Sequence, residues 1–173
     1  MFIIDAWEAI RDFLELGGPV LRVIGLNIFF LWVLILERLI YYRTGMVELI
    51  NNSIDEWNRR SDKTSWNAIQ IRESLISKAK IAAENSLPMI QTLVALCPLL
   101  GLMGTVTGMI QVFEVMAMSG TSNARAMAAG VSRATIPTMA GMVGALSGVF
   151  FVTILTRASK RYSASLEDSL MRN

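Results

Sequence analysis

Three long stretches that carry almost no charge constrain this chain more than any other feature of its sequence. They are residues 19–42, 85–113 and 134–156. Only the first contains charged side chains, namely Arg22, Glu37 and Arg38. About twenty residues of α-helix cover roughly 30 Å, which is the thickness of the hydrocarbon core of a bilayer. With 53% hydrophobic residues overall, the chain is predicted to be an all-α membrane protein with three transmembrane helices.

The second and third stretches share a regular spacing of small residues. Glycines recur at positions i, i+3 and i+7 in each, and residues at these offsets fall on one side of an α-helix. In a bilayer such a strip lets helix backbones approach closely, and this packing replaces the hydrophobic driving force that lipid does not provide. We predict that two small-residue strips pack against helices or line a pore. Their members are Gly101, Gly104 and Gly108 in the second span, and Ala134, Gly141, Ala145 and Gly148 in the third.

Charges and turn residues divide the chain into segments. We predict a periplasmic amphipathic helix at 1–18, a first transmembrane span at 19–42, a cytoplasmic helical segment at 43–86, a second span at 87–117, a periplasmic turn at 118–124, a third span at 125–157 and a cytoplasmic tail at 158–173. The amphipathic helix is indicated by apolar residues at helical spacing, Ile3, Trp7, Ile10 and Leu14, with acidic residues between them. A break and a helix cap are predicted at 61–65.

The distribution of basic residues predicts the orientation in the membrane. Eleven Lys and Arg residues fall in 43–84 and in the region from Arg157 onward. The opposite side carries only Arg11 and Arg125, with Arg22 and Arg133 near its interface. Because loops rich in Lys and Arg stay in the cytoplasm, the C-terminus is predicted to be cytoplasmic, and the N-terminus and the turn at 118–124 periplasmic.

The residue content excludes several classes of function. The chain has no histidine, which excludes Ser-His-Asp and Cys-His nucleophile pairs and histidine-ligated metal sites. Its one cysteine, Cys97, cannot form a disulfide within the chain. Sixteen Lys and Arg against fourteen Asp and Glu give a net charge of +2, too small to indicate nucleic-acid binding. We therefore expect no enzyme activity, no cofactor, no metal site and no nucleic-acid partner.

The centres of the second and third spans carry hydroxyls but no Asp, Glu, Lys or His. Thr105 lies on the glycine strip of the second span. Thr138 lies at helical spacing between Ala134 and Gly141, so it belongs to the small-residue strip of the third span. Proton pumps need ionisable groups inside the membrane, so a proton pathway here would take its carboxylate from another chain. Two interpretations stay open. The two threonines form a polar surface in a proton pathway, or their hydroxyls bond to carbonyls in ordinary helix packing.

Motifs in all three spans resemble those of a known family. Residues 98–108 read as an apolar lead followed by Gly-x-x-Gly-Thr-Val-x-Gly. The third span runs from Ala128-Ala129-Gly130-Val131 through Thr138 to Gly148, and the first ends on Leu36-Glu37-Arg38. These patterns resemble the ExbB/TolQ/MotA proton-channel family, and most closely its ExbB members. The resemblance covers roughly residues 19–165 and is most specific between 98 and 148.

The resemblance implies an assembly and a mechanism. It implies a homo-oligomer, pentameric in the family, whose long second and third helices extend into the cytoplasm and surround a central pore. It also implies an ExbD-like single-span partner in that pore, whose membrane aspartate carries the proton. Thr105 and Thr138 fall on the two family positions that face this aspartate. The chain would then be a stator subunit in the bacterial inner membrane that passes the work of proton flow to a TonB-like protein for outer-membrane uptake.

The chain departs from the family pattern near the start of its third span. The family usually has a glutamate about five residues before the third-span threonine, and here that position is Arg133, which cannot accept a proton. Pro137 has no amide hydrogen, so the carbonyl of Arg133 loses its helical partner.

A TolQ-like role in envelope maintenance would use the same spans. A proton-independent membrane scaffold, whose strips only assemble helices, is an alternative from a different class.

Overall fold

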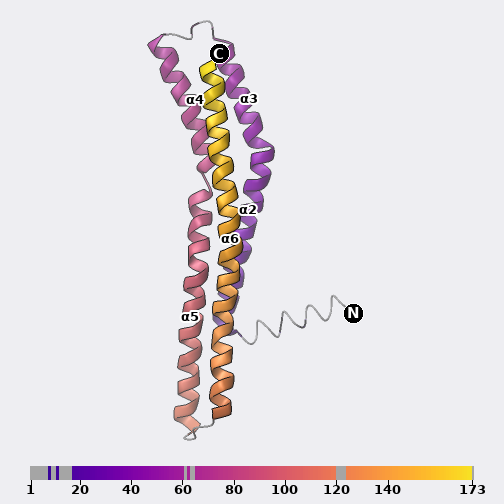
Figure 1. The fold of residues 1–173 in the computed structure, drawn as a ribbon, viewed down its shortest axis with the longest axis vertical. Helices are drawn as coiled ribbons and strands as arrows, with labels where there is room; N and C mark the ends of the chain where they lie inside the picture. Colours follow the sequence, from indigo (N-terminus) through magenta and orange to yellow (C-terminus); the bar gives the residue numbers. More distant parts are fainter. Residues whose placement is uncertain are drawn as a thin grey trace. The chain divides into compact units, whose positions relative to one another are not determined.

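The computed structural model describes residues 8, 11, 17–60, 62, 65–119 and 124–172. Every regular element among them is an α-helix (Figure 1): α2 (Gly18–Arg43), α3 (Gly45–Asn58), α4 (Trp66–Glu84), α5 (Leu87–Ser119) and α6 (Ala124–Arg172). The prediction of an all-α chain is therefore confirmed. The helix predicted at 1–18 and the turn predicted at 118–124 fall largely outside the described residues.

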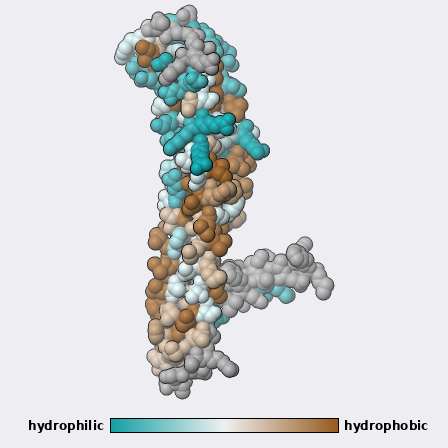
Figure 2. Space-filling model, in the orientation of Figure 1, coloured by the Kyte–Doolittle hydropathy of each residue, from teal (hydrophilic) through white to brown (hydrophobic). Residues whose placement is uncertain are grey.

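Three helical stretches are long and apolar enough to cross a membrane, as the sequence predicts. They are Gly18–Asn58, Trp66–Met118 and Gly130–Leu170. In each of them, at most 28% of the most apolar 18-residue segment is buried within the chain. Figure 2 shows hydrophilic side chains gathered over α3, α4 and the C-terminal part of α6, and mostly hydrophobic or intermediate ones over the other described residues. So much exposed apolar surface is expected of helices that are surrounded by lipid or by further chains.

Proline affects the helices differently at three positions. Pro98 and Pro137 lie inside α5 and α6, and both helices continue through them. Pro88 is the second residue of α5 and has no amide hydrogen to donate to the carbonyl of Glu84. The helix is interrupted just before it, at residues 85–86, which separates α4 from α5.

α4 begins with a side-chain cap in the region where the sequence predicts one. Ser65 is the N-cap, and its hydroxyl accepts a hydrogen bond from the backbone N–H of Ala68 at 3.3 Å. The N–H of Ser65 in turn donates to Oδ1 of Asp62 at 3.1 Å. A serine cap satisfies one of the N–H groups that the first turn of a helix leaves without a partner.

The chain forms two compact units. The first comprises residues 1–32 and 92–149, and the second 33–91 and 150–173. In the first unit, the described part of α2 packs against α6 through side chains that enter positions without a Cβ. Ile28 lies against Gly144, and Leu31 lies against Gly148. Leu31 is fully buried, so the core of this unit depends on the glycines of the third span.

In the second unit, two buried side chains of α2 cap the C-terminal end of α4. Arg38 is only 2% exposed and donates from Nη1 to the carbonyl of Ala82 at 3.1 Å. The Tyr42 hydroxyl donates to the carbonyl of Ala83 at 2.7 Å. These carbonyls lie in the last turn of α4, where helices leave them without N–H partners and where the helix dipole favours a cation. The Arg38 guanidinium also lies 5.0 Å from the ring centroid of Tyr41, which stabilises its charge.

Replacing Tyr42 with phenylalanine is expected to destabilise the second unit. The ring is kept, but the buried carbonyl of Ala83 loses its donor, at a cost of ~1–3 kcal/mol. Tyr41→Phe is the matched control, because Tyr41 contributes its ring to the contact with Arg38. Thermal unfolding of the detergent-solubilised proteins should give a lower midpoint for Tyr42→Phe alone. Equal midpoints for the two variants would show that this hydrogen bond does not stabilise the end of α4.

Candidate functional site

The two threonines singled out by the sequence meet in the first unit. Thr105 lies on α5 and Thr138 on α6, and their hydroxyl oxygens are 2.8 Å apart. Thr138 also donates to the carbonyl of Gly101 at 3.0 Å. The Thr105 hydroxyl reaches the carbonyls of Gly101 at 3.3 Å and Leu102 at 3.1 Å. Both side chains are partly exposed, so this threonine pair is accessible from outside the chain.

Two residues of the second-span strip let α5 and α6 approach closely enough for the threonine pair to form. A Cβ added to Gly101 would lie 3.0 Å from the Cα of Thr138, which is closer than side-chain contacts normally come. One turn further along α5, the ring of Pro137 occupies the space where Gly104 has no side chain. The hydroxyls can therefore meet because the backbones beside them are in near contact.

The other strip residues also lie against helices of the same chain. A Cβ on Gly108 would lie 2.9 Å from the Cα of Ala134, and one on Gly141 would lie 2.5 Å from the carbonyl oxygen of Cys97. The space beside Gly148 is filled by the side chain of Val94 of α5. Ala145 is partly buried on α6. Each of these glycines thus has a contact within the chain, and a pore-lining role for any strip residue stays a prediction.

The threonine pair offers two hydrogen-bond arrangements. Each hydroxyl has one proton to donate and lone pairs that accept. When Thr138 donates to the Gly101 carbonyl, Thr105 can donate to Thr138. When Thr105 donates to a carbonyl of its own helix, Thr138 can donate to Thr105. Rotation of two hydroxyls switches the pair, and an acceptor site remains for a proton donor that approaches from outside the chain.

The surroundings of the pair limit its chemistry. The segments 92–113 and 134–149 carry no charged residue. In the part of the chain that the structure describes, no group of three or more His, Cys, Asp or Glu could hold a metal ion. A threonine hydroxyl has no charge change of its own at physiological pH. The pair can therefore orient or relay a proton, and a group that stores the proton has to come from elsewhere.

One polar contact within the first unit was missed by the sequence reasoning. Cys97 of α5 lies 3.3 Å from Asn27 of α2, measured from Sγ to Oδ1, and Sγ also reaches the carbonyl of Leu93 at 3.4 Å. The signal was present, because a lone amide in an apolar span usually hydrogen-bonds to a neighbouring helix. Arg133 is exposed and does not join the threonine pair.

Comparison with known proteins gives a family and several relatives. The family described as MotA/TolQ/ExbB proton channel family matches residues 42–168. A putative biopolymer transport protein ExbB-like 1 from Synechocystis sp. is 39% identical over 70 residues, which cover 39% of this chain and 28% of that protein. Biopolymer transport protein ExbB from Salmonella typhimurium is 35% identical over 77 residues, covering 44% and 32% respectively. ExbB from Pseudomonas putida is 24% identical over 126 residues, which cover 70% of this chain and 38% of that protein. The matches therefore span well under half the length of these relatives.

Proposed function

The chain belongs to the MotA/TolQ/ExbB proton channel family, and we propose that it is a stator subunit of an inner-membrane proton-driven motor of the ExbB–ExbD type. In this role it harnesses the proton motive force to energise TonB-dependent uptake across the outer membrane. The named relatives in Salmonella typhimurium and Pseudomonas putida are biopolymer transport proteins, which agrees with a transport role. No step of the proposal requires enzyme chemistry.

The observation that carries the proposal is the threonine pair in two spans whose centres carry no acidic residue. The hydroxyls of Thr105 and Thr138 are 2.8 Å apart and partly exposed, and the segments around them are uncharged. A proton pathway that uses this pair needs a titratable carboxylate from another chain. An ExbD-like single-span protein with a membrane aspartate supplies that group, with its helix in a pore surrounded by several copies of this chain.

The assembly and orientation complete the proposal. We place the N-terminus in the periplasm and the C-terminus in the cytoplasm, on the strength of the eleven basic residues on the inner side. The long second and third helices then extend into the cytoplasm, and the chain assembles as a homo-oligomer, a pentamer as in the family. A TonB-like protein receives the work done by proton flow.

Complementation tests the proposal against its alternatives. In cells that lack their own ExbB-type and TolQ-type subunits, this chain and an ExbD-like protein should restore TonB-dependent uptake, and collapse of the proton gradient should abolish it. Rescue of envelope integrity without uptake would instead assign a TolQ-like role. A stable complex that restores neither function, with or without the gradient, would support a proton-independent scaffold.

A further inference from the structure

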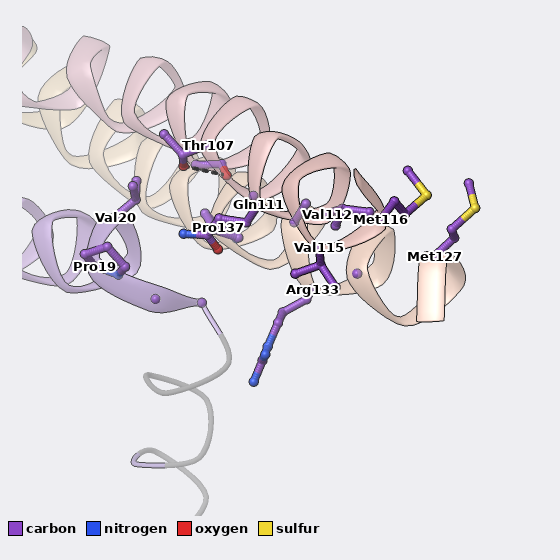
Figure 3. Close-up of a pocket in the computed structure, with 16 residues that line it drawn as sticks. Pro19, Val20, Thr107, Gln111, Val112, Val115, Met116, Met127, Arg133 and Pro137 are labelled. Carbon is purple, nitrogen blue, oxygen red and sulfur yellow. Dashed lines mark hydrogen bonds between the residues drawn. The ribbon is translucent and has the colours of Figure 1, made fainter. Parts of the chain in front are cut away.

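A cavity of about 480 Å³ lies in the first unit on the side of α5 and α6 that faces α2. Figure 3 shows it between the start of α2, marked by Pro19 and Val20, and the C-terminal part of α5 and the N-terminal part of α6. Most of its lining is apolar or glycine, including Val112, Val115 and Met116 of α5. Its size is in the range of pockets that hold small ligands.

The cavity exists because α2 begins part-way along the two longer helices. Val20, in the first turn of α2, lies against Gly104, whereas α5 continues to Ser119. At about 1.5 Å per residue, α5 extends roughly 20 Å beyond this contact. The described part of α2 therefore does not cover this stretch of α5 and α6. Thr105 and Thr138 do not line the cavity, so it is separate from the threonine pair.

Few polar side chains line the cavity, which favours an occupant that is mostly apolar. The Thr107 hydroxyl is within hydrogen-bonding distance of carbonyls of its own helix, those of Met103 at 3.0 Å and Gly104 at 3.1 Å, so it needs no partner in the cavity. Gln111 and Arg133 are the remaining polar side chains of the lining. The cavity thus offers a mostly apolar surface with one amide and one positive charge.

Arg133 places that charge at a depth where lipid phosphates lie. It directly precedes the uncharged run 134–156, so it stands at the edge of the hydrocarbon region, where arginine contacts headgroups. Its side chain is exposed and projects away from the ribbon of α6 in Figure 3. No described carboxylate forms an ion pair with it. An unpaired cation beside an apolar cavity in a membrane helix is complementary to an anionic lipid.

We propose that this cavity binds an anionic phospholipid, with an acyl chain along α5 and α6 and the phosphate at Arg133. The lipid covers the apolar face of α5 and α6 that α2 leaves open. The proposal requires only that the helices span a membrane, and it holds or fails independently of the proton-driven function.

Photo-crosslinking of the full chain in lipid nanodiscs tests the proposal. The probe is phosphatidylglycerol with a diazirine in its acyl chain, and the labelled peptides are identified by mass spectrometry. We expect labels within 104–116 and 127–137, and a decrease of about fivefold in Arg133→Gln, the factor expected for one basic residue at a membrane surface. Arg22→Gln is the matched control, because Arg22 is exposed on α2 and does not line the cavity; it should leave these labels unchanged.

Two further measurements keep the test decisive. A phosphatidylcholine probe should label the cavity peptides less and should respond less to Arg133→Gln than phosphatidylglycerol does, because its choline cation balances the charge of its phosphate. Val115→Trp adds bulk at an exposed lining position and should lower labelling by both probes. Equal labelling by the two probes in wild type and Arg133→Gln would overturn the anionic-lipid site. Absence of cavity labels, with labels retained at Leu146 and Phe150, would overturn it as well and would show that a second copy, a partner helix or the N-terminal segment closes the cavity.

Discussion

A chain that carries Thr105→Val and Thr138→Val together is expected to assemble with its ExbD-like partner but to lose proton-dependent uptake. Valine keeps the shape of threonine and removes only the hydroxyl, so the close contact between α5 and α6 survives. What is lost is the 2.8 Å contact between the hydroxyls and the bond from Thr138 to the carbonyl of Gly101. Each single variant should also lose uptake, because the switch between the two arrangements needs both hydroxyls.

The expected size of this loss follows from the group that the pair would serve. A hydrogen bond to a charged group contributes about 1.5–3 kcal/mol, and every 1.4 kcal/mol is a factor of ten. If the hydroxyls stabilise a partner's carboxylate as it titrates, their removal should slow uptake roughly ten- to a hundredfold. Transport should be measured at matched expression, with co-purification of the partner as the check on assembly.

Thr153→Val is the control for this experiment. Thr153 lies on α6 in the second unit and is not part of the threonine pair, and its replacement should be nearly silent in the same assay. Full uptake by the Thr105/Thr138 double variant would remove both residues from the mechanism and return them to helix packing. Loss of uptake in Thr153→Val as well would mean that removing any hydroxyl from these helices lowers uptake. The effect would then not be specific to Thr105 and Thr138.

The sequence was sufficient to predict the helices and to place both threonines on the strips of small residues. Uncharged stretches longer than about twenty residues leave few alternatives to spanning helices. The spacing of Gly101, Gly104 and Gly108 fixed which side of the second span approaches another backbone. Thr105 lies on that strip and Thr138 on the equivalent strip of α6, and the structure shows that the two hydroxyls meet where the strips face each other.

The partners of the strips could not be predicted, because spacing fixes a face but not its occupant. A strip of glycines can pack equally well against a helix of the same chain or against a helix of another copy. Nothing in the sequence indicates that Gly141 meets the carbonyl of Cys97 or that Gly104 receives Pro137. The cavity beside Arg133 was hidden for a related reason. It depends on where α2 begins relative to α5, and hydropathy gives the length of a span but not its offset from its neighbours.

The close approach at Gly141 predicts a large effect from the smallest possible substitution. In Gly141→Ala the new Cβ would lie 2.5 Å from the Cys97 carbonyl oxygen and 3.3 Å from the Cα of Gly101. Both are backbone atoms, so no flexible side chain can move aside, and the two helices have to separate. Overpacking of this kind costs about 1–3 kcal/mol. We expect a lower thermal midpoint in detergent and a loss of assembled oligomer in size-exclusion chromatography.

Gly25→Ala separates close approach from helix propensity in this measurement. A Cβ on Gly25 would have no heavy atom within 4 Å, and alanine is preferred over glycine inside a helix by about 1 kcal/mol. This control should be neutral or slightly stabilising, so the two Gly→Ala variants are expected to differ in the sign of their effect. Gly104→Leu and Gly144→Leu should follow Gly141→Ala, since their added atoms would meet Pro137 and Ile28. If all of these variants assembled normally, the strips would be facing lipid, and the threonine pair would lose the helix contact that holds it together.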